Sequence, residues 1–155
     1  MPKSILVTGG TKGIGKAIIH RFAKEGFDIA TCSRNQEDLR RLKEELESKF
    51  PKIKVIAEVA DLSQKDQVKA LATKVQAEFQ PDVLVNNTGL FLPGAIHDEP
   101  EGNFELMMHT NLFSAYYLTR IFIGEMIQRK SGHIFSIGSI AGTTAYPNGG
   151  SYAIS

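Results

Sequence analysis

Thr8-Gly9-Gly10-Thr11-Lys12-Gly13-Ile14-Gly15 follows a short apolar run and leads directly into an amphipathic segment. Glycine lets a backbone turn tightly and lets a ligand approach closely. A helix that begins at such a turn offers unpaired N–H groups and a partial positive charge to an anion. The stretch therefore predicts a strand, a tight turn and a helix that together hold a diphosphate-bearing ligand.

Two other interpretations of this turn remain open. Gly10 to Lys16 has the spacing of the nucleotide-binding P-loop, but Ala17 stands where that motif needs Ser or Thr to hold magnesium. A glycine turn without any ligand is the second alternative.

Outward from the turn, short apolar runs alternate with amphipathic segments along the chain. We expect strands at residues 4–8, 27–33, 53–59, 82–86 and 133–137, and helices at residues 13–25, 36–49, 63–79 and 103–130. This alternation favours βαβ units on a parallel sheet. A chain of 155 residues is long enough to bury roughly 70% of its unfolded surface, so we expect one domain spanning residues 1–155.

Three of the helices carry signals of a buried face or an end. Residues 36–49 place leucines at helical spacing among charged residues, so this helix should cover one face of the sheet. Ser63 and Asp66 have the spacing of a capping box at the start of the third helix. Gly26 suits the left-handed residue that ends the first helix.

The segment 103–130 is apolar almost all round, so we expect it to be buried on more than one side. It is either a core helix of a larger domain or a subunit interface. The segments 90–102 and 140–150 are rich in Gly, Pro, Asn and Thr, and each follows a predicted strand. Open α/β sheets bind ligands at that edge, so these loops should border the site.

Charge and composition narrow the classes of partner. With 18 basic and 17 acidic side chains the net charge is +1, which gives no reason to expect binding to nucleic acid or to an anionic membrane. The single cysteine, Cys32, cannot form an internal disulfide, and residues 1–7 do not resemble a signal peptide, so we expect a cytoplasmic protein. No stretch reaches the ~20 apolar residues that span a bilayer.

Further candidate motif residues follow the glycine turn along the chain. Asp61-Leu62 follows the third predicted strand, Asn86-Asn87-Thr88-Gly89 ends the fourth, Asn111 lies in the long helix, Ser139 follows the fifth strand and Tyr152 comes after it. Together with the motif Thr-Gly-x-x-x-Gly-x-Gly, they resemble the short-chain dehydrogenase/reductase family, in its ketoacyl-reductase-like or sepiapterin-reductase-like part. The resemblance implies a Rossmann-type, doubly wound α/β fold with strand order 3-2-1-4-5, in which the C-terminal part of the family fold is absent.

The resemblance also implies a set of cofactor-binding residues and no metal site. The set comprises Gly9, Thr11, Lys12, Gly13, Ile14, Gly15, Ser33, Arg34, Asn35, Asp61, Leu62, Asn87, Thr88 and Gly89. In the family the acid at Asp61 bonds the adenine. Thr88 departs from the alanine that the family usually has, and its hydroxyl either crowds the cofactor ribose or bonds to it.

The charges at the end of the second strand predict which cofactor is bound. Residues 32–35, Cys-Ser-Arg-Asn, contain no carboxylate to take the ribose hydroxyls of NAD. Arg34 offers a planar fork to a 2′-phosphate, and Lys12 can approach it from the other side. We therefore expect NADP(H) to be preferred over NAD(H); the alternative is that both cations are only solvated.

The resemblance implies an oxidoreductase that exchanges hydride with a small carbonyl substrate. Ser139 would bond the substrate oxygen, Tyr152 would donate or accept the proton and Asn111 would hold a water in the proton path. The family assembles as homodimers or homotetramers, here through the helix 103–130. A module that binds or senses NADP(H) without turnover is the alternative.

The family's Tyr-x-x-x-Lys motif calls for a lysine one residue beyond Ser155, where this chain ends. Either the sequence is part of a longer protein, or the protein ends here without a complete acid–base system. We favour the first, because a helix that begins near Ser151 would otherwise be abandoned after one turn.

Overall fold

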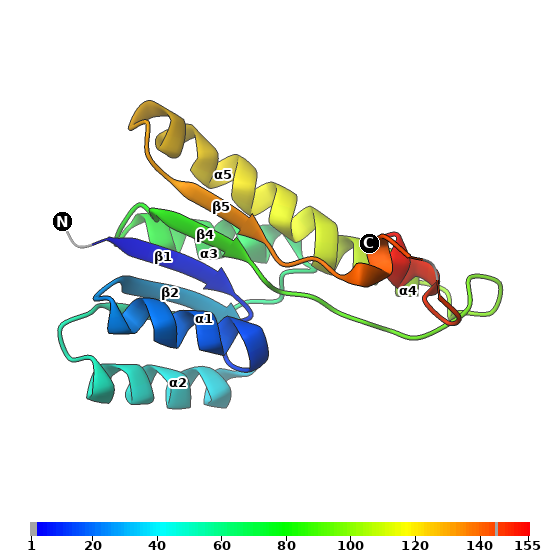
Figure 1. Ribbon diagram of the computed structural model, residues 1–155, viewed down its shortest axis with the longest axis horizontal. Helices are drawn as coiled ribbons and strands as arrows, with labels where there is room; N and C mark the ends of the chain where they lie inside the picture. Colours follow the sequence, from blue (N-terminus) through cyan, green and yellow to red (C-terminus); the bar gives the residue numbers. More distant parts are fainter. Residues whose placement is uncertain (1–2, 145) are drawn as a thin grey trace.

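The computed structural model describes residues 3–144 and 146–155, which form one parallel sheet of five strands with helices on both faces (Figure 1). In chain order the elements are β1 (Ser4–Thr8), α1 (Gly13–Lys24), β2 (Asp28–Ser33), α2 (Gln36–Lys49), β3 (Val55–Val59), α3 (Lys65–Gln76), β4 (Val83–Asn86), α4 (Asn103–Met107), the π-helical η1 (Met108–Phe113), α5 (Ser114–Gln128), β5 (His133–Ser136), and the 3₁₀ turns η2 (Ile140–Gly142) and η3 (Gly150–Ala153). The strand order is β3-β2-β1-β4-β5, which confirms the predicted α/β topology.

β1 lies at the centre of the sheet and sends alternate side chains into two cores. Ile5 and Val7 pack with residues of α1 and α2 on one face. Leu6 packs with residues of α3 and α5 on the other. Because β1 pairs in parallel with both β2 and β4, the carboxyl ends of these strands meet at one edge of the sheet. The loops that follow the strands are thereby brought together at that edge.

Of the two helix ends predicted from single residues, the end of α1 is confirmed and the start of α3 is wrong. Gly26 adopts φ +80° just beyond α1, as predicted for a left-handed residue that ends a helix. The capping box predicted at Ser63 is wrong, because α3 begins at Lys65 with Gln64 as its N-cap. The backbone N–H of Ser63 instead donates to Asp61 Oδ1 at 3.0 Å, which orders the loop after β3.

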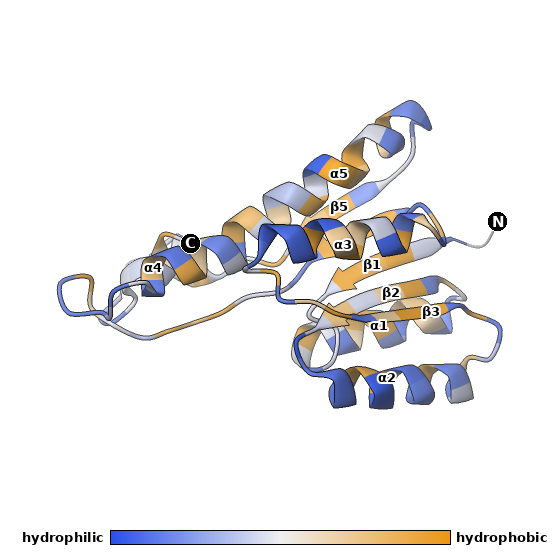
Figure 2. Cartoon of the chain, turned by 180° about the vertical axis from the view of Figure 1, so that it is seen from behind, coloured by the Kyte–Doolittle hydropathy of each residue, from blue (hydrophilic) through white to orange (hydrophobic). Residues whose placement is uncertain are grey.

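The long helix predicted at residues 103–130 is divided into α4, η1 and α5. Within this single chain only one side of α5 is buried, and burial of a second side, in a larger domain or at a subunit interface, stays a prediction. Leu118 and Phe122 on α5 are buried against the sheet. Tyr116 and Ile127 on its other side are 53% and 67% exposed. Figure 2 shows hydrophobic residues along α5, whereas α2 is mostly hydrophilic. Apolar composition alone does not tell a buried face from an unpartnered one.

Within residues 3–144 and 146–155, no helix has the length and apolar character needed to cross a membrane. The same residues contain no group of three or more His, Cys, Asp or Glu side chains placed to hold a metal ion.

Candidate functional site

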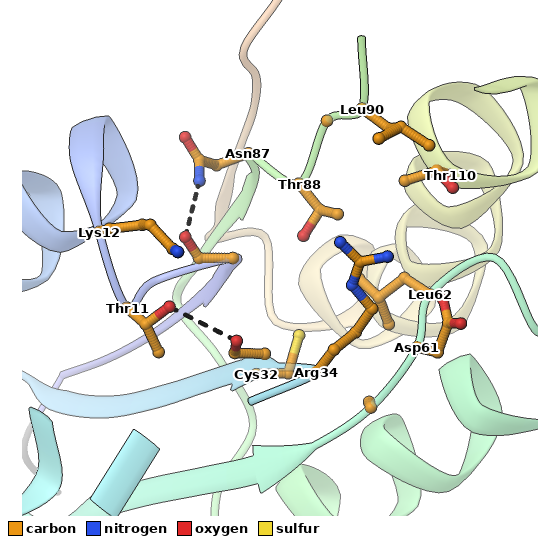
Figure 3. Close-up of a pocket in the computed structure, with 14 residues that line it drawn as sticks. Thr11, Lys12, Cys32, Arg34, Asp61, Leu62, Asn87, Thr88, Leu90 and Thr110 are labelled. Carbon is orange, nitrogen blue, oxygen red and sulfur yellow. Dashed lines mark hydrogen bonds between the residues drawn. The ribbon is translucent and has the colours of Figure 1, made fainter. Parts of the chain in front are cut away.

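Two cavities open at the carboxyl edge of the sheet. The small cavity, of about 290 Å³, is lined by the turn after β1, the end of β2 and the loops after β3 and β4 (Figure 3). The large cavity, of about 820 Å³, is lined by the start of α1, the loops after β4 and β5, and η3. Residues 87–90 line both, so the two cavities meet along the loop after β4.

The structure brings together nearly all the predicted cofactor residues around these cavities. Those that line the small cavity are Gly9, Thr11, Lys12, Ser33, Arg34, Asp61, Leu62, Asn87, Thr88 and Gly89. Gly13 and Ile14 line the large cavity. Asn35 lines a neighbouring recess, and Gly15 is buried beneath the turn.

The glycines of the turn are required for two different physical reasons. Gly9 and Gly13 adopt φ of +66° and +57°, the left-handed region that favours glycine. Gly10 and Gly15 are required by packing: a Cβ on Gly10 would lie 2.2 Å from Thr31 Oγ1, and a Cβ on Gly15 would lie 2.6 Å from the carbonyl oxygen of Gly9. Nothing lies within 4 Å of a Cβ placed on Gly13, so this side of the turn is open. The cradle fits a phosphate-bearing ligand that approaches the start of α1.

Thr8 braces the glycine turn against the loop after β4, a role that the sequence reasoning missed. Its buried Oγ1 accepts hydrogen bonds from the backbone N–H groups of Asn87 and Thr88, both at 2.9 Å. The Asn87 side-chain amide returns two bonds, to the carbonyl oxygens of Thr8 at 2.9 Å and Gly9 at 3.2 Å. A threonine at the end of the first strand, directly before the glycines, was the available signal. The Asn87 amide is therefore used to hold the turn.

Replacing Thr8 with valine should lower the free energy of unfolding by about 2–3 kcal/mol, because two backbone N–H groups lose their acceptor while the side-chain shape is retained. Urea unfolding followed by circular dichroism measures the change. Thr8→Ser keeps the acceptor and should recover most of the loss. Thr73→Val, on the exposed side of α3, is the control and should change stability by less than about 0.5 kcal/mol. Equal losses at positions 8 and 73 would contradict the brace.

A recess of about 540 Å³ adjoins the small cavity and is lined by both predicted phosphate-binding cations, Lys12 and Arg34. Figure 3 shows the Arg34 side chain extending from the end of β2 into the small cavity. The Lys12 side chain is 84% exposed, and its Nζ lies 4.0 Å from Asp38 Oδ2. Residues 32–35 contain no carboxylate, as the sequence showed, but the first turn of α2 brings Asp38 to the same place.

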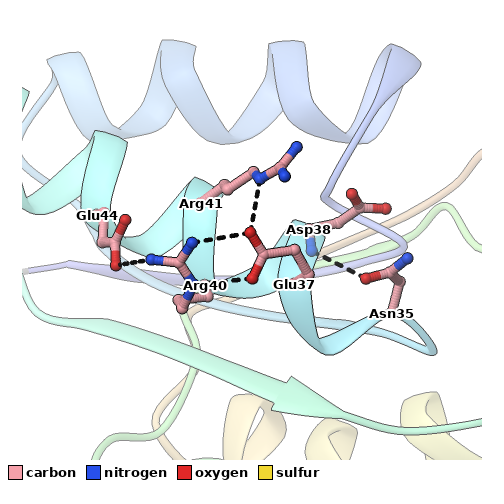
Figure 4. A network of polar contacts seen from close by, with 6 residues as sticks. All are labelled: Asn35, Glu37, Asp38, Arg40, Arg41 and Glu44. Carbon is pink, nitrogen blue, oxygen red and sulfur yellow. Dashed lines mark hydrogen bonds and ion pairs between the residues drawn. The ribbon is translucent and has the colours of Figure 1, made fainter.

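Two arginines of α2, Arg40 and Arg41, form ion pairs with Glu37 on the same helix (Figure 4). Arg40 donates to both carboxylate oxygens of Glu37, at 2.9 and 2.8 Å, and Arg41 Nε donates to one of them at 2.8 Å. These hydrogen bonds lower the pKa of Glu37 to about 2. Asn35 caps the helix by accepting a hydrogen bond from the Asp38 N–H at 3.0 Å. Arg40 and Arg41 are thus paired along the helix and line neither the small cavity nor the recess, whereas Arg34 lines both.

Cys32 and Thr88 both line the small cavity, the first with a thiol and the second with a hydroxyl. Cys32 is buried there, and burial raises the pKa of its thiol to about 11, so it remains protonated at neutral pH. Thr88 lines both cavities, and a Cβ on Gly9 would lie 3.0 Å from its Oγ1. Its hydroxyl thus lies between the two cavities, close to the glycine turn.

The three predicted catalytic residues, Asn111, Ser139 and Tyr152, all line the large cavity. Ser139 Oγ accepts a hydrogen bond from the Ala141 N–H at 3.1 Å and so caps η2. A hydroxyl that accepts one bond still has its proton to donate, so capping leaves Ser139 able to bond a ligand oxygen. The aromatic ring of Tyr152 packs against Phe91, with 4.8 Å between the ring centres.

Asn111 lies within the π-helical segment η1, where its side chain joins the helix to the loop after β4. Its Oδ1 accepts from the Leu90 N–H at 2.7 Å, and its Nδ2 donates to the Leu90 carbonyl oxygen and to Ser155 Oγ, both at 2.9 Å. Short π-helical segments are rare and frequently occur at functional sites. The side-chain amide is thus occupied by protein groups, and the water-holding role stays a prediction.

The site also includes residues that the sequence reasoning did not select. Leu90 and Phe91 line the large cavity, and Thr110 and Leu90 line the small one. The apolar stretch after the Asn-Asn-Thr-Gly motif was a signal for Leu90 and Phe91. Thr110 lies one residue before Asn111 on a helical segment and carried no signal of its own.

Known proteins have similar sequences and the same fold. The family model described as short chain dehydrogenase matches residues 3–155. The NADP-dependent 3-hydroxy acid dehydrogenase YdfG of Escherichia coli K12 is 35% identical over 96% of this chain, and the sepiapterin reductase of Chlorobaculum tepidum is 34% identical over all of it. The crystal structure of a metagenomic short-chain oxidoreductase in complex with NADP matches 98% of this chain and 69% of that chain, at 32% identity and a TM-score of 0.90.

This chain spans 58% of the length of the E. coli relative and 66% of that from C. tepidum. The similarity therefore covers the glycine turn, the sheet and the segment that carries Tyr152, and only part of the relatives' length. Since the family model matches 153 residues, from 3 to 155, and each relative matches nearly the whole of this chain, the chain belongs to the short-chain dehydrogenase/reductase family.

Proposed function

We propose that this protein is an NADP-dependent oxidoreductase that exchanges a hydride between NADP(H) and a small carbonyl or alcohol substrate. The observation that carries the proposal is the meeting of the two cavities. One is lined by Lys12 and Arg34, and the other by Ser139 and Tyr152, which lie far from those cations in the sequence. A dinucleotide spans such a pair of sites with its phosphates at the glycine turn between them.

Some residues of this chain would bind the cofactor, and others would bind the substrate oxygen or transfer the proton. Gly13 and Ile14 hold the diphosphate at the start of α1, Asp61 and Leu62 border the adenine, and Arg34 meets the 2′-phosphate. When bound, the nicotinamide supplies the hydride. Ser139 donates its hydroxyl proton to the substrate oxygen in a hydrogen bond. Tyr152 gives a proton to that oxygen in reduction and takes it back in alcohol oxidation.

Cofactor preference tests the binding half of the proposal. Arg34→Ala should weaken NADPH binding by about 10–100-fold, because a charge-assisted bond to the 2′-phosphate is lost, and should change NADH binding by less than about twofold. Titration of cofactor fluorescence gives both dissociation constants. Arg41→Ala removes an arginine that is paired with Glu37 on α2, and should change neither constant. Tighter binding of NADH than NADPH by the unchanged protein would contradict the assignment.

Turnover tests the chemical half. The loss of NADPH absorbance is followed with a panel of carbonyl compounds that includes a 3-oxo acid ester and sepiapterin, and the reverse reaction is followed with NADP⁺ and 3-hydroxybutyrate. The relatives' names, a 3-hydroxy acid dehydrogenase and a sepiapterin reductase, suggest these classes of substrate. Tight NADPH binding without turnover of any compound would support a binding or sensing module instead.

The outer side of α5 is the proposed subunit interface. Tyr116, Ile123 and Ile127 are exposed on it, and apolar residues gathered on one helix face are typical of an interface. We propose a homodimer or homotetramer formed through α4, η1 and α5.

A further inference from the structure

Glu99 lies in the loop after β4 and contacts the segment just before Tyr152. Its Oε2 accepts a hydrogen bond from the Ser151 N–H at 3.3 Å, and its Oε1 accepts one from the Ser151 hydroxyl. Ser151 is 1% exposed. Both carboxylate oxygens are thus bonded to the residue that immediately precedes the predicted proton donor, from a position 52 residues away in the chain.

Backbone contacts next to this carboxylate join the same two segments. The N–H of Gly94 donates to the carbonyl oxygen of Asn148 at 3.2 Å. Gly150 adopts φ +40°, and a Cβ on it would lie 2.3 Å from the Gly94 carbonyl oxygen and 3.0 Å from Glu99 Oε2. Only glycine at position 150 allows this approach without a shift. The loop after β4 and the start of η3 are therefore packed backbone to backbone.

The same loop also contacts Tyr152 itself. Phe91 packs its ring against that of Tyr152, with 4.8 Å between the ring centres and 58° between the ring planes. The tyrosine is thus fixed at two points by residues of one loop: its ring by Phe91, and the backbone before it by Glu99.

We propose that Glu99 is a positioning residue that holds Ser151, and through it Tyr152, in the geometry needed for proton transfer. The proposal rests on the proposed function, because it needs Tyr152 to be the proton donor. A carboxylate makes stronger bonds to N–H and O–H donors than a neutral acceptor does. A proton donor displaced by about 1 Å costs on the order of 10²-fold in rate, so a small loss of order at η3 has a large effect on turnover.

Glu99→Ala tests the proposal through two readouts. Amide hydrogen exchange, read by mass spectrometry over residues 146–155, should become about 10–100-fold faster because the Ser151 amide loses a charge-assisted bond. The kcat for ketone reduction should fall by about 10–100-fold while the NADPH dissociation constant changes by less than about twofold. Glu99→Gln, which keeps an acceptor oxygen, should recover part of both effects.

Two controls separate positioning from a general loss of structure. Glu101→Ala removes the same charge two residues along, where the side chain is exposed, and should change neither readout. In a Tyr152→Phe background, Glu99→Ala should leave the residual rate unchanged within about twofold, because the residue through which it acts is already inactive.

The outcomes can be told apart. Unchanged exchange at residues 146–155, or faster exchange with an unchanged kcat, would overturn the positioning role. A further fall in rate in the Tyr152→Phe background would overturn it as well, by showing that Glu99 acts elsewhere. An unchanged protein that binds NADPH and reduces nothing would remove the proposed function instead, before any variant is compared.

Discussion

Replacing Tyr152 with phenylalanine should reduce turnover by about 10²–10⁴-fold, the range that a positioned proton donor contributes. The change removes one hydroxyl and keeps the ring that packs against Phe91, so the local packing is retained. Tyr152 lines the large cavity but not the small one, where the predicted adenine and 2′-phosphate contacts lie. The NADPH dissociation constant should therefore change by less than about twofold.

Steady-state kinetics and cofactor titration on the same preparation measure this prediction. Tyr146→Phe is a matched control, because Tyr146 is also exposed in part and does not line the cavity. It should leave kcat unchanged within about twofold. If Tyr152→Phe weakened NADPH binding as much as it slowed turnover, Tyr152 would be a structural residue rather than the proton donor.

Replacing Gly15 with alanine should lower the unfolding free energy by about 2–4 kcal/mol and weaken NADPH binding by on the order of 100-fold. The added Cβ would lie 2.6 Å from the Gly9 carbonyl oxygen and 2.5 Å from Asn87 Nδ2. The first of these atoms is backbone, so the turn or the start of α1 must shift. Either shift moves the N–H groups that are proposed to hold the diphosphate and breaks the bond from Asn87 to Gly9.

Ser48→Ala is the control for this prediction. Ser48 is exposed on α2, outside the glycine turn and outside the proposed interface. Alanine is a better helix former than serine, so this variant should be as stable as the unchanged protein or more so. Urea unfolding and NADPH titration of both variants make the comparison. A Gly15→Ala protein that binds NADPH normally would show that the turn does not hold the cofactor.

Much of the fold could be predicted because its determinants are local. Strands β1 to β5 lie within two residues of their predicted bounds, since each is a short run rich in apolar or β-branched residues between turn residues. Gly26 ended α1 as predicted, because only the local backbone decides that residue's conformation. The capping box failed at Ser63 because Asp61 already bonds its N–H in the preceding loop.

For the predicted helix at residues 103–130, the local sequence could predict neither which side is buried nor the π-helical segment. Its apolar composition is the same whether the outer face of α5 meets protein or solvent, and only the packing against α3 and the sheet decides which side is buried. The π-helical segment at Asn111 also had no local signal. It accompanies the bonds between the Asn111 side chain and Leu90, which lies 21 residues away in the chain.

The sequence by itself determined the α/β topology, the glycine turn, the family and many of the residues that border the two cavities, though not Leu90, Phe91 or Thr110. These follow from residue type and order, because a strand, a turn or a motif is specified by neighbours in the chain. Only the tertiary structure decided how those residues are held. Thr8 accepts hydrogen bonds from the backbone of Asn87 and Thr88, on the loop after the neighbouring strand. Asp38 lies beside Lys12, and Glu99 accepts a hydrogen bond from Ser151. Each of these contacts joins segments that are far apart in the chain, and the packing of the whole domain fixes the distance between them, so the residues of one segment alone do not specify the contact.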